Sequence, residues 1–385
     1  MLAHSPPLPL IIDYLDEVHT TAEVQESVVL ALRHRDRVRR IRLQLPPRNL
    51  QRLISAIDGE FPMLEYLYFA PPFKCDERLI FPKTFRAPHL RHLIPTNIFP
   101  IGSPLLMTHG SLVTLSLQHI PRFAYFPPND LLNWLSHLPQ LETLLISFSS
   151  PPPSCTVKRQ LLLTPITTSV MLPNLRWFGF GGVCAYLEAL LPRITVPLLE
   201  KFQILFIDQL TLSTQYLLQF MGTTEDFRCG SARFRFSDYG VVVWVDALRG
   251  ANKFAFYMHL LCNSRNLQAA HTARFFLALG AVSSAVEHLI LELEIGFIEE
   301  VDPARWYELL GSFSSVKFLL VDHRLIREIS RSLQSDDGEF STELLPELKV
   351  LSYAAGDNDR GEGFTAFVDA RQNAGRPVTL SRFST

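Results

Sequence analysis

The chain has 385 residues, of which 47% are apolar and 19% are charged, and its formal net charge is −2 at pH 7. This composition is typical of a soluble globular protein and excludes a global basic field that would attract nucleic acid. The chain is too long for one closed hydrophobic core, but a repeat protein avoids that limit because it grows in one dimension.

The first predicted elements are a strand within LPLIIDYL and a helix within TAEVQESVVLALRH. The strand is indicated by Leu8, Leu10 and Ile12, since alternate side chains of a strand share one face. We expect residues 1–36 to cap the fold. The N-terminal apolar run of five residues, without a basic segment before it, is too short for a signal peptide or a membrane span.

From residue 38 onward a short pattern recurs ten times: an apolar anchor is followed by apolar residues three and five positions later. Only the third segment departs from it, because Pro95 occupies the last position. The anchors are 22 to 34 residues apart, except for one interval of 87, and regular leucine-rich repeats have about 20–29 residues. The anchors are Val38, Leu64, Leu90, Leu112, Leu141, Leu175, Leu199, Val286, Val316 and Leu348.

Each segment is predicted to be a strand whose anchor and following apolar residues enter a shared core. The intervening segments have helical periodicity. We expect a helix over 49–61 with Asn49 as its N-cap, and another over 302–313 with Asp302 as N-cap and Pro303 at the first helical position. Because a crossover through a helix joins parallel strands, the prediction is a parallel, concave sheet with helices on the convex side.

The long interval between anchors contains SARFRF, GVVVWV and KFAFYMHLL, which alternate like strands. Two interpretations stay open for it: degenerate repeats over 205–285, or a β-hairpin insertion near 231–262. Residues 345–385 are predicted to form a last repeat and a C-terminal cap. The sequence thus predicts one α/β domain over 1–385, an irregular leucine-rich-repeat-like solenoid.

Several segments together resemble a large group of fungal F-box/leucine-rich-repeat-like proteins. They include LALRHRDRVRRIRL, LPQLETLLI, SSAVEHLIL and the closing DARQNAGRPV. The resemblance implies that the repeats receive a target protein, while an F-box docks the adaptor of a cullin ubiquitin ligase. No F-box is found in this chain, so we expect the adaptor as a partner only if an F-box exists upstream.

A partner protein of unknown identity is expected on the concave face, formed by side chains that point away from the core. Exposed tyrosine, tryptophan and arginine are frequent anchors of interfaces. The early strands supply basic and aromatic groups, and the late ones supply acidic groups. The predicted partner-binding residues are Arg40, Arg42, Tyr66, Tyr68, His92, Gln118, Trp177, Lys201, Gln203, His288, Glu292, Phe318 and Asp322.

The alternative function is binding of nucleic acid or another anionic ligand by the arginine cluster Arg33–Arg42, although nucleic acid is the less expected partner. Gly179, Gly181 and Gly182 could mark a phosphate site between a strand and a helix, but they lack the GxGxxG spacing. No catalytic motif is found, so we expect no enzyme, cofactor or metal site. The five scattered cysteines favour a cytoplasmic or nuclear location.

Overall fold

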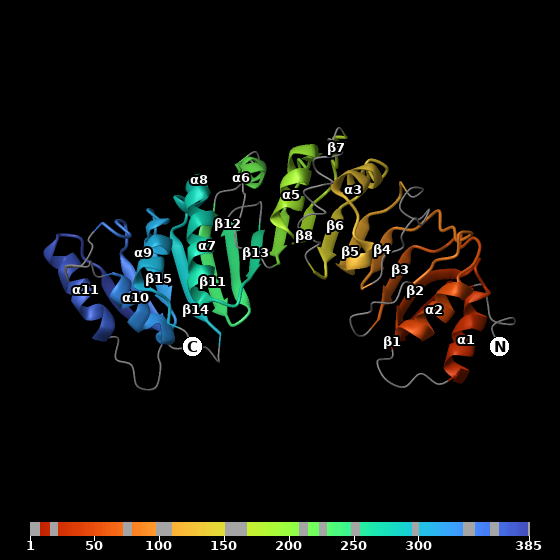
Figure 1. Cartoon of the computed structure of the whole chain (residues 1–385), viewed down its shortest axis with the longest axis horizontal. Helices are drawn as coiled ribbons and strands as arrows, with labels where there is room; N and C mark the ends of the chain where they lie inside the picture. Colours follow the sequence, from red (N-terminus) through yellow and green to blue (C-terminus); the bar gives the residue numbers. More distant parts are fainter. Residues whose placement is uncertain are drawn as a thin grey trace. The chain divides into compact units, whose positions relative to one another are not determined.

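The computed structural model describes residues 8–15, 22–71, 79–97, 110–150, 168–207, 215–222, 229–247, 255–294, 300–333, 343–354 and 362–383. The chain divides into two compact units, Met1–Leu199 (unit 1) and Glu200–Thr385 (unit 2), which we describe separately. Both combine helices with mostly parallel strands (Figure 1). None of the described helices has both the length and the hydropathy that crossing a membrane requires.

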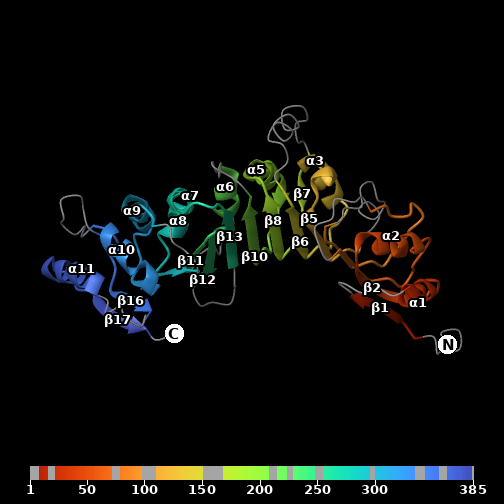
Figure 2. The same ribbon diagram turned by 60° about the horizontal axis from the view of Figure 1, so that its bottom comes forward.

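Unit 1 has the strand order β1-β2-β3-β4-β5-β6-β8, and each of these neighbours pairs in parallel. Helices α2, α3 and α5 lie on one face of its strands (Figure 2). The strands are β1 (Leu10–Leu15), β2 (Val38–Gln44), β3 (Tyr66–Ala70), β4 (His92–Pro95), β5 (Thr114–Ile120), β6 (Thr143–Phe148) and β8 (Trp177–Gly182), with the small pair β7 (Val170–Met171) and β9 (Ile194–Thr195) apart. The helices are α1 (Ala22–Leu32), α2 (Pro47–Ala56), α3 (Pro128–Leu135) and α5 (Cys184–Leu190), with short 3-10 turns η3 (Arg122–Ala124) and η4 (Leu191–Arg193).

The repeat pattern corresponds to the core. All ten anchors are buried, and so are all the residues three and five positions after them, including Pro95. In unit 1 the strands are paired so that equivalent positions align: Leu67 of β3 lies between Ile41 of β2 and Leu93 of β4. Each apolar side chain is therefore covered by its equivalents on both neighbouring strands, which no single strand could provide.

The charged residue that follows most anchors also has a structural role. Arg39 and Glu65 occupy this position on successive strands and form an ion pair of 3.0 Å. In unit 2, Lys317 and Glu287 do the same at 2.6 Å, and this lowers the pKa of Glu287. Because these side chains are substantially exposed, the pairs stabilise the strand entries only modestly.

Unit 2 has the strand order β10-β13-β12-β11-β14-β15-β16-β17. Its strands are β10 (Lys201–Phe206), β11 (Cys229–Ser237), β12 (Gly240–Ala247), β13 (Ala255–Leu261), β14 (His288–Leu293), β15 (Phe318–Val321), β16 (Val350–Ala354) and β17 (Thr379–Phe383). Its helices are α6 (Gln215–Gly222), α7 (Arg265–Ala278), α8 (Gly280–Ser283), α9 (Pro303–Gly311), α10 (Ile326–Ser332) and α11 (Glu362–Asn373), with the 3-10 turn η5 (His323–Leu325).

Strand β12 is the exception to parallel pairing. It runs antiparallel to both β11 and β13, whereas β13 is parallel to β10 and β11 is parallel to β14. The link from β11 to β12 consists of Asp238 and Tyr239, which is too short for the crossover that parallel strands need. The expected hairpin near 231–262 is confirmed and includes a third strand.

The two predicted helix starts had different outcomes. Asp302 caps α9 as expected, since its side chain accepts a hydrogen bond of 3.0 Å from the backbone N–H of Ala304, and Pro303 is the first helical residue. Asn49 is not an N-cap: helix α2 starts earlier, with Pro46 as N-cap residue and Pro47 at the first helical position. Proline is favoured there because it has no N–H to leave unbonded.

We predict that Leu67→Ala lowers the free energy of unfolding by about 2 to 5 kcal/mol, because it leaves a cavity between Ile41 and Leu93. The measurement is urea denaturation followed by circular dichroism. Leu30→Ala on α1 is the matched control, since this leucine is 53% exposed, and it should change the free energy by less than about 0.5 kcal/mol. Equal effects of the two substitutions would contradict the core assignment.

Candidate functional site: the outer face of the strands

Side chains that point away from the core form what we call the outer face of each unit. In unit 1, register pairing places Arg40, Tyr66, His92 and Thr114 side by side on β2, β3, β4 and β5. All four are partly exposed, whereas the residues that flank each of them within its strand and face the core are buried. Three of these four were predicted as partner-binding residues, and the structure brings them into one row.

Contacts within this row are continuous. Asp13 of β1 pairs with Nε of Arg40 at 3.1 Å, and the guanidinium carbon of Arg40 lies 4.6 Å from the centre of the Tyr66 ring. The Tyr66 and His92 ring centres are 5.8 Å apart. Nδ1 of His92 and Oγ1 of Thr114 are at a hydrogen-bond distance of 3.0 Å. The side chains are thus held in place by one another before any partner binds.

A second cation–π pair lies beside the first. The guanidinium carbon of Arg42 is 5.3 Å from the Tyr68 ring centre, again between β2 and β3. The other two predicted residues of unit 1 lie elsewhere on its outer face. Gln118 donates a hydrogen bond of 3.0 Å to Oγ of Ser116, and Trp177 of β8 aligns with Thr143 of β6. The row and the Arg42–Tyr68 pair lie at neighbouring positions of β2 and β3.

The arginine cluster is largely engaged in contacts within unit 1. Arg37 donates to the backbone oxygen of Leu8 at 3.1 Å and 3.2 Å, and Arg39 and Arg40 each have a carboxylate partner. A surface that binds nucleic acid needs several cations free to contact phosphates. These internal contacts favour a structural role for Arg37, Arg39 and Arg40 over the anionic-ligand alternative.

Five of the six predicted residues of unit 2 lie in three places. His288 and Phe318 lie opposite each other on β14 and β15, with rings stacked 4.5 Å apart at 9°. Lys201 and Gln203 lie on β10 beside β13. Asp322 caps η5 by accepting a hydrogen bond from the backbone N–H of Arg324, and it also pairs with the Arg324 guanidinium at 2.8 Å. Partial burial raises the pKa of Asp322, but the hydrogen bonds and charge of Arg324 outweigh it, so the pKa is lowered.

Glu292 is also compensated, so the late strands are less acidic than expected. Nε and Nη2 of Arg235 lie 3.0 Å and 2.9 Å from one carboxylate oxygen of Glu292, and Nε of Arg233 lies 3.7 Å from the other. Both arginines come from β11, which pairs with β14. The prediction that these strands are acidic did not take into account the arginines of β11, which the antiparallel insertion places beside β14.

Sequence reasoning missed the aromatic part of this site. The guanidinium carbon of Arg235 lies 5.1 Å from the Trp244 ring centre, and Trp244 contacts Tyr257 edge-on at 5.8 Å. A continuous row therefore runs from Glu292 through Arg235 and Trp244 to Tyr257, like the row in unit 1. The signal was present in SARFRF, where arginines alternate with phenylalanines that are buried.

The glycine-rich stretch is not a strand-to-helix phosphate loop. Gly179 and Gly181 lie inside β8, paired with β6. A Cβ atom at Gly179 would lie 2.5 Å from a methyl carbon of Leu145, and one at Gly181 would lie 2.7 Å from Oγ of Ser147. These glycines are explained by close packing between neighbouring strands.

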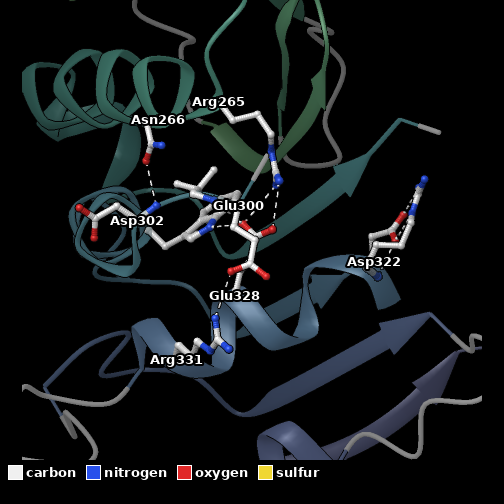
Figure 3. Close-up of polar contacts among 10 residues, drawn as sticks. Arg265, Asn266, Glu300, Asp302, Asp322, Glu328 and Arg331 are labelled. Atoms are coloured by element: carbon white, nitrogen blue, oxygen red, sulfur yellow. Dashed lines mark hydrogen bonds and ion pairs between the residues drawn. The ribbon is translucent and has the colours of Figure 1, made fainter. Parts of the chain in front are cut away.

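Unit 2 also contains a buried polar cluster between α7, α9 and α10 (Figure 3). Arg265 forms a bidentate pair with Glu328 at 3.0 Å and 3.2 Å, and both side chains are more than nine-tenths buried. Oε2 of Glu328 also accepts from Nε1 of Trp306 at 2.9 Å and from the backbone N–H of Val301 at 3.2 Å. Both carboxylate oxygens accept hydrogen bonds, so the cluster ties α7, α9 and α10 together.

No protein-family model and no curated protein matches this chain. Among the described residues, no three histidine, cysteine, aspartate or glutamate side chains are grouped as metal ligands.

We predict that His92 makes stability depend on pH. Its pKa is lowered from 6.5, mainly by burial and secondly by Arg91, against the opposing charges of Glu65 and Glu142. The unfolded chain consequently binds a proton at higher pH than the folded chain, so stability declines as the pH falls below about 6.5 and levels off below the folded pKa. His92→Gln should lose less thermal stability than the parent between about pH 7.5 and pH 5.5. Identical curves of melting temperature against pH for the parent and for His92→Gln would contradict this prediction.

We also predict that Glu328→Gln lowers the free energy of unfolding by about 3 to 5 kcal/mol, because it leaves the buried Arg265 guanidinium without a countercharge. The matched control is Glu300→Gln, which removes the exposed pair of 3.2 Å with Arg331 drawn in the same view (Figure 3). That change should cost less than about 1 kcal/mol. Chemical denaturation measures both, and a small loss for Glu328→Gln would show that the cluster is dispensable.

Proposed function

We propose that this chain is a protein-interaction module, built as an irregular leucine-rich-repeat-like solenoid, that binds a partner protein on the outer face of its strands. The supporting observation is the row from Asp13 through Arg40, Tyr66 and His92 to Thr114, because cation–π, ring and polar contacts hold interface-forming side chains in place on an exposed surface. Such preorganisation reduces the entropy that binding would otherwise cost.

The repeat architecture supports the proposal in a second way. The core uses the side chains of each strand that face the helices, so the opposite side chains are not needed for packing and can differ from strand to strand. Tyrosine and arginine occur there next to one another, and both are enriched among residues that dominate binding energy. The outer row of unit 2, with Arg235, Trp244 and Tyr257, has the same chemistry.

The narrower part of the proposal is a role in target recognition by a cullin ubiquitin ligase. It rests on the resemblance to fungal F-box/leucine-rich-repeat-like proteins. It requires that the natural protein bind the cullin adaptor, whereas partner binding by the outer face does not depend on that contact. Intracellular function, in the cytoplasm or nucleus, belongs to this same proposal.

We predict that replacing Tyr66 and Tyr68 together by serine reduces partner capture at least about tenfold, because interface tyrosines contribute disproportionately to binding. Quantitative mass spectrometry of proteins retained by the immobilised full chain measures this, and melting temperature checks folding. Trp177→Ser is a second test on the same face.

The matched control is Tyr307→Ser on α9, a tyrosine that is 44% exposed on a helix. It should retain every partner that the parent chain retains. The proposal fails if the double variant keeps the partners, or if the control loses them to the same extent.

A further inference from the structure

Within the part of the chain that the structure describes, Arg42 differs from the neighbouring arginines of its strand in having no ion-pair partner. Arg40, on the same strand and face, pairs with Asp13, and Arg39 pairs with Glu65. In the register of β1 and β2, Asp13 lies opposite Arg42, yet its carboxylate contacts Arg40. Nε is shielded from solvent without a hydrogen-bond partner in both Arg40 and Arg42, so the ion pair of Arg40 with Asp13 is what distinguishes them among the described residues.

The position of the Arg42 guanidinium is nevertheless defined. It lies over the Tyr68 ring at 5.3 Å, and Tyr68 is its direct neighbour on β3. A guanidinium placed on an aromatic face keeps its N–H groups directed outward at its edges, in the planar arrangement that matches a carboxylate. Because the ring restricts the side chain beforehand, less conformational entropy is lost when an anion binds.

Two exposed aliphatic side chains of β1 lie diagonally across from Arg42, on either side of Asp13. On β1, Ile11 and Leu15 flank Asp13 on the same face and are 66% and 48% exposed. Exposed large aliphatic side chains that lie beside a cation favour a ligand that has apolar groups next to its negative charge. They would not favour a fully hydrated ion.

Few charged side chains lie on this part of the outer face. The outward positions of β1 to β4 contain Asp13, Arg40 and Arg42 as charged side chains. His92 is predominantly neutral near pH 7, since burial lowers its pKa. The charges of Asp13 and Arg40 cancel, so at the described outward positions of β1 to β4 the positive charge of Arg42 remains. One cation fits one carboxylate of a polypeptide better than the repeated phosphates of a nucleic acid.

We propose that the outer face of unit 1 recognises an acidic side chain, aspartate or glutamate, flanked by apolar residues in the partner protein, with Arg42 as the anion-binding residue and Ile11, Leu15 and Tyr68 as the apolar surroundings. This inference rests on the proposed function, because it takes the outer face as the partner-binding surface. It adds the chemistry that the partner must have.

The test is selection of binders from a phage-displayed library of random peptides against the full chain, in parallel with Arg42→Glu and Arg48→Glu. Arg48 is the matched control because it is an exposed arginine on helix α2. Peptides selected by the parent and by Arg48→Glu should be enriched in aspartate or glutamate beside aliphatic residues. Those selected by Arg42→Glu should instead be enriched in lysine or arginine. For one selected peptide, fluorescence polarisation should show affinity about tenfold lower with Arg42→Gln.

Two results would overturn the inference. Either the parent chain selects peptides without a preference for acidic residues, or Arg42→Glu and Arg48→Glu weaken that preference equally. Failure to select any peptide would overturn it as well. The Tyr66 and Tyr68 double variant separates this failure from that of the proposed function. If selected peptides lack acidic residues but still require the tyrosines, the outer face binds a partner and only its chemistry was wrongly inferred. If they do not require the tyrosines, the proposed function fails too.

Discussion

The structure depends on one constraint, the alignment of equivalent apolar side chains across neighbouring parallel strands. Ile41, Leu67 and Leu93 occupy one such row, and each is essentially inaccessible to solvent. A strand of five or six residues cannot bury its apolar side chains alone. Each strand therefore depends on its neighbours, and the position of every side chain on the opposite face follows from this alignment.

That dependence explains why candidate binding residues form rows. When Leu67 aligns with Ile41, Tyr66 must align with Arg40 and Tyr68 with Arg42. The cation–π pairs thus have two causes: core packing fixes the alignment of the strands, and arginine and tyrosine occupy aligned positions on the face that the core does not use. The same reasoning holds in unit 2, where burial of Phe234 and Phe236 places Arg233 and Arg235 on the outer face beside Glu292.

The sequence allowed prediction of those features that follow from local periodicity. Anchors, strands, the cap of α9 by Asp302 and the outward orientation of Arg40 and Tyr66 all follow from the two-residue period of a strand or from the requirements of a helix terminus. Features that depend on partners distant in the chain could not be predicted. Glu292 is compensated by arginines more than fifty residues earlier, and the buried pair of Arg265 and Glu328 joins residues 63 positions apart. In both cases the charged residues can be read from the sequence, but the sequence does not indicate which of them form ion pairs.

The central claim is that one face of the strands packs the core while the other face binds a partner. Thiol labelling tests this claim directly. Single cysteines would be placed at the positions of Arg40, Tyr66 and Tyr68 on the outer face and of Ile41, Leu67 and Phe69 in the core. Labelling rates would then be measured with and without a captured partner. The account predicts that outer cysteines react in the free protein and become protected in the complex, while core cysteines react in neither. Outer cysteines that still react in the complex, or core cysteines that react as fast as outer ones, would contradict it.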